Sequence, residues 1–214
     1  MKHVVNEILD HLFANYPQLL VCRDDITAAF KIMKDCYEGG GKILVCGNGG
    51  SAADSEHIVG ELMKGFKLKR GICDKDADMI RKAFPENSQF ITTSLQRAIP
   101  AISLVSQTSL ISAYVNDVSA EMVFAQQVYG YYKDRDITIG LSTSGNAANV
   151  LNAIRLTKAL GGQAIGFTGE SGGKMKAHCD VTIKVPADET YMVQEYHLPV
   201  YHALCAMMEA EIFA

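Results

Sequence analysis

The sequence lacks the features that would anchor it in a membrane or link it by disulfides. No run of 18 or more apolar residues occurs, and the N-terminal MKHVVNEILDHLF is amphipathic rather than signal-like. The six cysteines are scattered, form no CxxC pair, and several lie in apolar runs. We therefore expect a cytoplasmic protein whose cysteines are reduced thiols that serve as small hydrophobic side chains.

An excess of basic residues is missing too. The chain has 20 Lys and Arg against 24 Asp and Glu, so its net charge at pH 7 is −4. Such a chain has no overall field that attracts nucleic acid or an anionic membrane, and we expect neither as a partner. No tandem repeat, low-complexity segment or linker interrupts the 214 residues, so we expect one domain over residues 1–214.

Residues 42–61, KILVCGNGGSAADSEHIVGE, predict a strand that runs through a glycine turn into a helix. Residues 42–46 are a short apolar run typical of a buried strand, and Ser51 is placed to cap the helix. Free backbone N–H groups and the helix dipole favour an anion at such a turn. The turn therefore supplies four candidate phosphate-binding residues: Asn48, Gly49, Gly50 and Ser51.

Two nucleotide-binding motifs do not fit this turn. No Lys-Ser or Lys-Thr pair follows its glycines, as a nucleoside-triphosphate loop requires, and Ala52 stands where GxGxxG needs its third glycine. We accordingly expect no nucleotide cofactor. A plain turn between a strand and a helix explains the same residues and stays open as an alternative.

His57 and Glu61 lie four residues apart on the predicted helix and therefore share a face. An imidazole and a carboxylate can move protons, and both are acceptable zinc ligands. The phosphate turn and this pair come from one element. A histidine that only packs in the core is the alternative interpretation of His57.

Strands alternate with helices along the rest of the chain. Further strands are predicted at 101–105, 136–141, 163–168 and 181–185, and helices at 2–15, 23–37, 120–132, 150–160 and 189–213, with another after the polar residues 106–109. This order predicts an α/β fold whose parallel sheet is covered by helices on both faces. Ligands then bind outside the carboxyl ends of the strands.

The strand at 136–141 runs into STSGN, which repeats the pattern of the first turn. Hydroxyl groups and free N–H groups can enclose a phosphate monoester without a fixed charge. Serine and threonine are also ordinary capping residues, so a structural role is the alternative. The candidate phosphate-binding residues here are Ser142, Thr143, Ser144 and Asn146.

Three other segments bear on the architecture. The two leading helices exceed what one sheet face needs, which suggests an oligomer. Residues 67–98 have poor apolar periodicity, and we expect an irregular excursion with a short helix at 77–84, either a lid, an oligomer contact or a solvated loop. In the final helix Gln194 and His202 share a face, and Pro199 should disturb the hydrogen bonds around Glu195.

Four motifs in this order, GNGGSAADSEHIVGEL, LSTSGNAANV, TGESGGKM and VQEYHLPVYH, resemble the sugar isomerase (SIS) domain family, specifically its phosphoheptose isomerase branch. The resemblance covers residues 2–212 apart from 67–98. It implies a single SIS domain with a five-stranded parallel sheet and a homotetramer with sites shared between subunits. The implied reaction interconverts sedoheptulose 7-phosphate and glycero-manno-heptose 7-phosphate.

The resemblance also implies roles for particular residues. Asn48, Ser51, Ser142, Thr143 and Ser144 match positions that hold the sugar phosphate. The catalytic centre, which binds zinc in several members, matches His57, Glu61, Gln194 and His202. For an enediol reaction we assign Glu61 as the base and His202 as the acid.

Four positions depart from the family pattern and bear on sugar specificity. Ala147 replaces a common serine, Gly65 a common arginine, Gln107 a usual aspartate, and Tyr191 an aspartate that commonly precedes Gln194.

Two other functions compete with the isomerase. One is a non-catalytic SIS protein of the replication-initiator-binding type, and the other is a sugar-phosphate-sensing regulator. Retention of Glu61 and His202 favours the enzyme.

Overall fold

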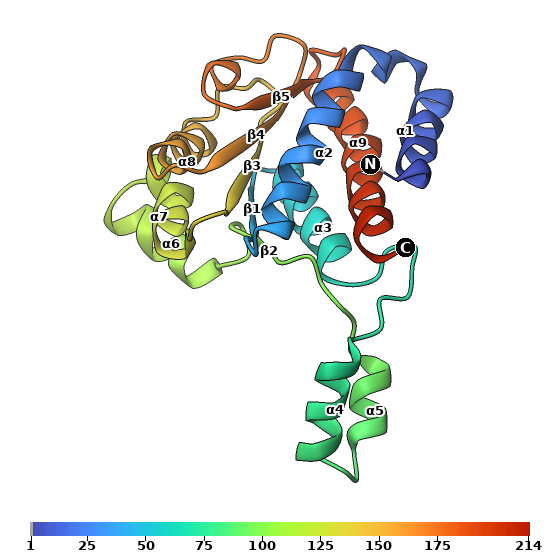
Figure 1. Cartoon of the computed structure of the whole chain (residues 1–214). Coiled ribbons are helices and arrows are strands. Elements are labelled where there is room, and N and C mark those ends of the chain that lie inside the picture. The colour runs from blue at the N-terminus through green and yellow to red at the C-terminus, as the bar shows by residue number, and fades with distance from the viewer. Residues whose placement is uncertain (1) are drawn as a thin grey trace.

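Helices cover both faces of one five-stranded parallel sheet in the computed structural model, which describes residues 2–214 (Figure 1). The strands are β1 (Ile43–Cys46), β2 (Ala101–Ser103), β3 (Ile137–Leu141), β4 (Gln163–Thr168) and β5 (Val181–Lys184). The α-helices are α1 (His3–Asn15), α2 (Arg23–Glu38), α3 (Gly50–Met63), α4 (Asp74–Ala83), α5 (Ser88–Ser94), α6 (Thr108–Asp117), α7 (Val123–Tyr131), α8 (Ala148–Ala159) and α9 (Thr190–Phe213). Short 3₁₀ helices lie at Pro17–Cys22, Ala120–Met122 and Met175–Ala177. The predicted α/β fold is confirmed.

The order of the strands brings the two predicted phosphate loops together. The sheet runs β2-β1-β3-β4-β5, and every neighbouring pair is parallel. The chain passes from β1 outward to β2 and then returns to β3 on the other side of β1. The strand order therefore reverses between β1 and β3, and open α/β sheets bind ligands at this switch point. The loops that follow β1 and β3 both leave from it.

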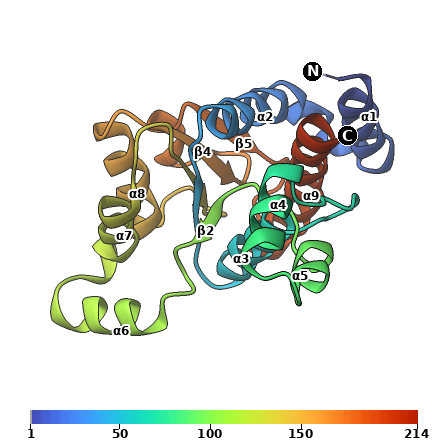
Figure 2. The same ribbon diagram turned by 60° about the horizontal axis from the view of Figure 1, so that its bottom comes forward.

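Alternate residues of a strand pack on opposite faces of the sheet, in two separate hydrophobic cores. In β1, Ile43 and Val45 pack with the core that α1, α2, α3 and α9 share, while Leu44 and Cys46 pack with α7 and α8. Figure 2 shows these two groups of helices on opposite sides of the sheet, with α6 at the margin. All six cysteines are free thiols, and Cys73 is the exposed one. Among residues 2–214, none of the helices is both long and apolar enough to span a bilayer.

Residues 67–98 form a helical hairpin, which corrects the prediction of an irregular excursion with one short helix. Helices α4 and α5 project from the body of the molecule (Figure 1), and Ala77 is the one buried residue within them. At the base of the hairpin, Gly71 and Gln96 form an antiparallel bridge. Because the two helices pack mainly on each other, few apolar residues mark them in the sequence.

The start of α3 also differs from the prediction. Gly49, not Ser51, is the N-cap, and its φ of +56° is a conformation that favours glycine. Ser51 lies in the first turn of the helix and is buried. No side chain caps this helix end. The first turn of α3 therefore presents backbone N–H groups beside the glycine loop.

A buried ion pair joins the far end of α3 to α9. The Glu209 carboxylate accepts hydrogen bonds from Arg70 Nε (2.7 Å) and from the amides of Phe66 (2.8 Å), Lys67 (2.7 Å) and Leu68 (3.1 Å). Arg70, which is 0% exposed, also donates to the backbone carbonyls of Leu62 (2.7 Å) and of Glu61 (3.1 Å). These bonds satisfy both charges and fix the end of α3 against α9.

Replacing Glu209 by Gln should cost about 3–5 kcal/mol of unfolding free energy at pH 7, because Arg70 would stay buried without its anion. Burial by itself raises the pKa of Glu209, but the Phe66 and Lys67 amides and Arg70 together lower it below its ordinary value. The stabilisation is therefore complete above the unfolded-state pKa and disappears as the pH falls through the lower folded-state pKa.

Urea unfolding of the wild type and Glu209→Gln between pH 7 and pH 3 measures this difference. We expect it to shrink below about pH 4.5, near the pKa of glutamate in an unfolded chain. Glu86→Gln in the exposed tip of the hairpin is the control, with an effect of at most about 0.5 kcal/mol. A difference that stays constant with pH would contradict this account of the ion pair.

Candidate active site

The loops after β1 and β3 enclose a cavity of about 430 Å³. The first turn of α9 closes one side of it with Thr190 and Gln194. Ala147 lines it too. So do all four candidates of the first loop and three of the second: Asn48, Gly49, Gly50, Ser51, Ser142, Thr143 and Ser144. Asn146, the eighth predicted residue, is exposed, and its amide donates to the carbonyl of Ser144 (2.9 Å).

Both loops are held by neighbouring segments. Asn48 and Asn149 exchange two side-chain hydrogen bonds of 2.9 Å, which tie the first loop to the start of α8. Gly145 packs so closely on the segment after β4 that a Cβ on it would lie 2.3 Å from the carbonyl oxygen of Gly172. Lys174 N donates to Asn146 Oδ1 (3.1 Å). The TGESGGKM motif thus supports the second loop from behind.

Gln194 stands against the first loop. A methyl group on Gly50 would lie 2.6 Å from Gln194 Nε2, so the Gln194 amide packs directly against Gly50. Gln194 therefore faces the cavity between the loops. His202 lies eight residues further along α9, about 12 Å along the helix axis.

Helices α3 and α9 bring three of the four predicted catalytic-centre residues together. His57 Nε2 lies 3.4 Å from Glu61 Oε1 and 3.4 Å from His202 Nε2. The imidazole rings of His57 and His202 meet edge to face, with centroids 4.8 Å apart. The Glu61 side chain is 13% exposed and that of His57 42%, so solvent reaches His57 more readily than Glu61.

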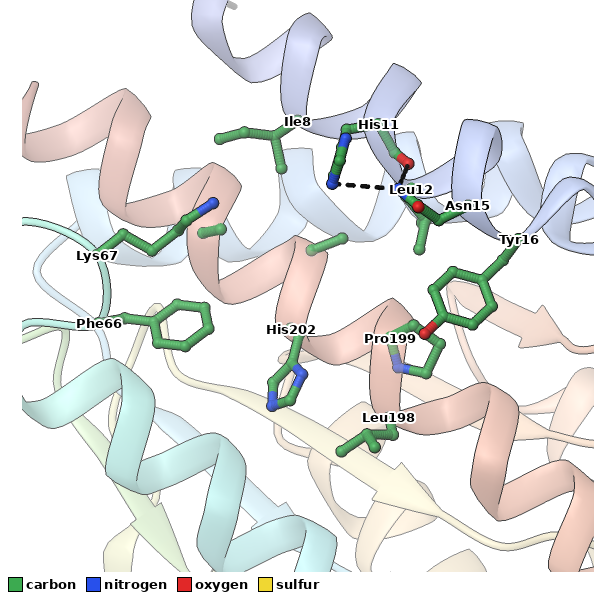
Figure 3. Close-up of a pocket in the computed structure, with 12 residues that line it drawn as sticks. Ile8, His11, Leu12, Asn15, Tyr16, Phe66, Lys67, Leu198, Pro199 and His202 are labelled. Atoms are coloured by element: carbon green, nitrogen blue, oxygen red, sulfur yellow. Dashed lines mark hydrogen bonds between the residues drawn. The ribbon is translucent and has the colours of Figure 1, made fainter.

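His202 opens on a second cavity, of about 330 Å³, between α1, α9 and the segment after α3. Figure 3 shows its ring directed toward Phe66, and the two ring centroids are 5.6 Å apart. Burial lowers the pKa of His202, the nearby His57 lowers it further, and Glu61 opposes both effects. The structure therefore favours the neutral imidazole at His202.

Three contributors to this cluster were not predicted from the sequence. Lys64 Nζ bonds Glu61 Oε2 at 2.9 Å, Tyr201 OH lies 2.9 Å from His57 Nδ1, and Tyr201 donates to Asp54 Oδ1 at 3.2 Å. Asp54 and Lys64 stand three residues from His57 and Glu61 respectively, so helical spacing could have indicated both. Tyr201 gave no comparable signal, since its partners lie on another helix.

The donor atoms suit zinc in type and in pairwise spacing. Two ligands of a tetrahedral zinc with bonds of about 2.0–2.1 Å lie about 3.3 Å apart, close to both distances at His57. In the described part of the chain, however, no group of three or more His, Cys, Asp or Glu side chains is arranged to hold a metal ion. Gln194, the fourth predicted ligand, lies against Gly50 instead.

Comparison with known families agrees with the fold. Two models of the SIS domain match residues 96–210 and 21–93. The chain belongs to the SIS domain family. The expected resemblance is therefore confirmed over nearly the whole chain.

The relatives to which this SIS-domain protein is most similar in sequence include phosphoheptose isomerases. It is 34% identical to the phosphoheptose isomerase of Aliarcobacter butzleri over 98% of this chain and 97% of that protein. It is 36% identical to the phosphoheptose isomerase of Clostridium acetobutylicum, over 89% of this chain and 84% of that one. The similarity thus spans both loops and the long final helix.

Solved structures of the same branch share the fold. A phosphoheptose isomerase from Francisella tularensis matches with a TM-score of 0.73 and 26% identity, over 98% of this chain and all of that one. The phosphoheptose isomerase of Neisseria gonorrhoeae gives a TM-score of 0.68 at 28% identity, over 93% of this chain and 98% of that one.

The four departures from the family pattern lie in different surroundings. Ala147 lines the cavity between the loops, and Gln107 is the N-cap of α6. Tyr191 is 62% exposed in the first turn of α9. At Gly65 a Cβ would lie 2.4 Å from the carbonyl oxygen of Leu68, so the local turn excludes an arginine. Of the four, Ala147 is the departure that faces the cavity.

Proposed function

We propose that this SIS-domain protein is a phosphosugar isomerase that interconverts sedoheptulose 7-phosphate and D-glycero-manno-heptose 7-phosphate. One observation carries the proposal: helix α3 begins at the cavity between the two loops and also carries His57 and Glu61. His57 Nε2 lies 3.4 Å from Glu61 Oε1 and 3.4 Å from His202 Nε2. The relatives named phosphoheptose isomerase supply the substrate class. A phosphate site and an acid–base cluster on one helix suit a phosphorylated open-chain sugar.

We place the phosphate in the cavity between the loops. The backbone N–H groups at the start of α3 and the hydroxyls of Ser142, Thr143 and Ser144 are its donors. Gln194 marks the path from this cavity toward His202, because both side chains stand on α9. The sugar chain then extends along α3 and α9 toward His57 and Glu61.

Aldose–ketose isomerisation moves a proton between C1 and C2 through an enediol. Glu61 takes the proton from one carbon while His202 donates its N–H to the carbonyl oxygen. In the second half, the hydroxyl on the neighbouring carbon returns a proton to His202, and Glu61 delivers its proton to the first carbonyl carbon. A neutral imidazole suits this role, since it can donate one N–H and later accept a proton.

Zinc is the cofactor that the donor set suits best, with His57, Glu61, Gln194 and His202 as the proposed ligands. Two distances support it: His57 Nε2 lies 3.4 Å from both Glu61 Oε1 and His202 Nε2, close to the separation of two ligands of one zinc ion. Bound there, the ion would polarise the substrate oxygens. Gln194 would have to turn from Gly50 to join the other three.

Replacing Glu61 by Gln should lower kcat by at least about 10²-fold with little change in KM, because shape is kept and the basic charge is lost. The measurement is steady-state kinetics with sedoheptulose 7-phosphate, with and without added zinc or chelator, together with solvent deuterium incorporation at C2 of the product. Glu56→Gln, on the same helix but exposed, is the control. Near-wild-type turnover in both Glu61→Gln and His202→Gln would refute the assignment and favour a partner-binding protein.

Replacing Ser144 by Ala should weaken binding of the sugar phosphate by about 1–2 kcal/mol, the scale of one lost hydrogen bond to a charged group. Thr143→Val tests the neighbouring hydroxyl in the same way. Isothermal titration calorimetry measures both, and Ser94→Ala on the exposed helix α5 is the control. Unchanged affinity in both loop variants would place the phosphate elsewhere.

We also propose that the protein is a homo-oligomer, most simply a tetramer. The exposed apolar side chains of Leu20 and Val21 and the lack of any buried residue within α6 support this, since such surfaces are often covered by another subunit. Light scattering at micromolar concentration should give a multiple of the 23.3 kDa chain mass. A monomer mass would contradict the proposal.

A further inference from the structure

A tyrosine on α9 links two side chains of α3 behind the acid–base cluster. Tyr201 OH lies 2.9 Å from His57 Nδ1 and 3.2 Å from Asp54 Oδ1. Tyr201 is 1% exposed, and its ring packs edge to face on that of His57 with centroids 5.4 Å apart. Asp54 and His57 stand one helical turn apart, so the hydroxyl bridges neighbouring positions on one face.

The number of donors on these groups determines whether Tyr201 or His57 donates in the bond between them. A phenol has one O–H, and here it is directed to Asp54 Oδ1. The oxygen of Tyr201 can therefore only accept from His57, which must carry its proton on Nδ1. The other nitrogen of the neutral ring, Nε2, then has a free lone pair, and it is the atom that lies 3.4 Å from both Glu61 and His202.

Asp54 is half-buried, and one of its carboxylate oxygens has no partner among the described residues. Its Oδ2 atom is inaccessible to solvent and has no hydrogen-bond partner within residues 2–214. Buried polar atoms are normally paired, and each exception calls for a cause. A carboxylate that holds the Tyr201 hydroxyl in one direction is such a cause, since without it the O–H could turn toward His57 Nδ1 and reverse the ring's proton.

We infer that Tyr201, directed by Asp54, is a positioning residue that holds His57 in its Nδ1–H form and aims the Nε2 lone pair at Glu61 and His202. The inference rests on the proposed function, because it gives that lone pair a use as a proton acceptor or zinc ligand. Partners that orient the second nitrogen of a histidine typically change metal affinity or activity by about 10–100-fold when removed.

The direct test reads the imidazole nitrogens of His57 by long-range ¹H–¹⁵N NMR in chelator-treated protein, with His57→Gln used to assign its signals. In the wild type we expect a protonated Nδ1 and a bare Nε2. In Tyr201→Phe the Nδ1–H loses its acceptor, and the Nε2–H form should gain population. Tyr196→Phe, a partly buried tyrosine on the same helix, should leave the His57 signals unchanged. A wild type in the Nε2–H form, or an unchanged tautomer in Tyr201→Phe, would overturn the inference.

Function provides a second readout. Tyr201→Phe should lower kcat about 10-fold, change KM less than about twofold, and weaken zinc binding in a chelator competition about 10-fold. Asp54→Asn keeps the shape and tests the direction of the hydroxyl, and its effect should not add to that of Tyr201→Phe because both act through one bond. Additive losses of kcat in the double variant, or a change in KM alone, would overturn the positioning role of Tyr201.

The role of Tyr201 and the isomerase activity can fail independently of each other. A tautomer change in Tyr201→Phe without any isomerase activity in the wild type would uphold the positioning role of Tyr201 and refute the proposed function. Wild-type isomerase activity with no tautomer change in Tyr201→Phe would refute the positioning role and leave the proposed function standing. If Tyr201→Phe unfolds, the NMR measurement on Asp54→Asn decides, because the hydroxyl is then free to turn toward His57.

Discussion

The buried pair of Arg70 and Glu209 is the constraint on which the candidate site depends. The Arg70 guanidinium donates to two carbonyls at the end of α3, those of Glu61 and Leu62, while the Glu209 carboxylate accepts from three amides of the segment that follows. Helix ends leave four carbonyls without intrahelical partners, so a cation there is favoured by both hydrogen bonding and the helix dipole. Because Glu209 belongs to α9, the same bonds set the distance between the helices that carry Glu61 and His202.

The two ends of helix α3 have opposite polarity and different surroundings. At its start, glycines leave backbone N–H groups exposed to an anion. At its end, Arg70 donates hydrogen bonds to the carbonyls of Glu61 and Leu62. His57 lies seven residues beyond Gly50, about 10 Å along the axis, so the helix works as a spacer between the two loops and the acid–base cluster. The spacing is then set by the rise of a helix rather than by a flexible loop.

Local signals allowed the parts of the site that lie on single elements to be predicted. The strand–glycine–helix turn, the STSGN loop and the i, i+4 pair of His57 and Glu61 each follow from a short stretch of sequence, and so does the alternation that predicts the parallel sheet. Their convergence at the switch point follows from the strand order, which the chain alone does not state. Arg70, Tyr201 and the helical hairpin were missed, because each is defined by a partner 100 or more residues away or by packing on itself.

The departure at Gly65 shows how one backbone turn redistributes charge near the candidate base. The segment after α3 turns so tightly that Gly65 N donates to Gln96 Oε1 at 2.5 Å and a side chain would meet Leu68. An arginine at this position, which the family resemblance led us to expect, therefore has no room here. Two neighbouring cations stand on either side of the turn instead. Lys64 contacts the Glu61 carboxylate from the solvent side at 2.9 Å, while Arg70 holds the Glu61 carbonyl from within the core at 3.1 Å. The carboxylate thus has a cation beside it, and that cation is a lysine on a flexible four-carbon stem that can move aside when a sugar enters.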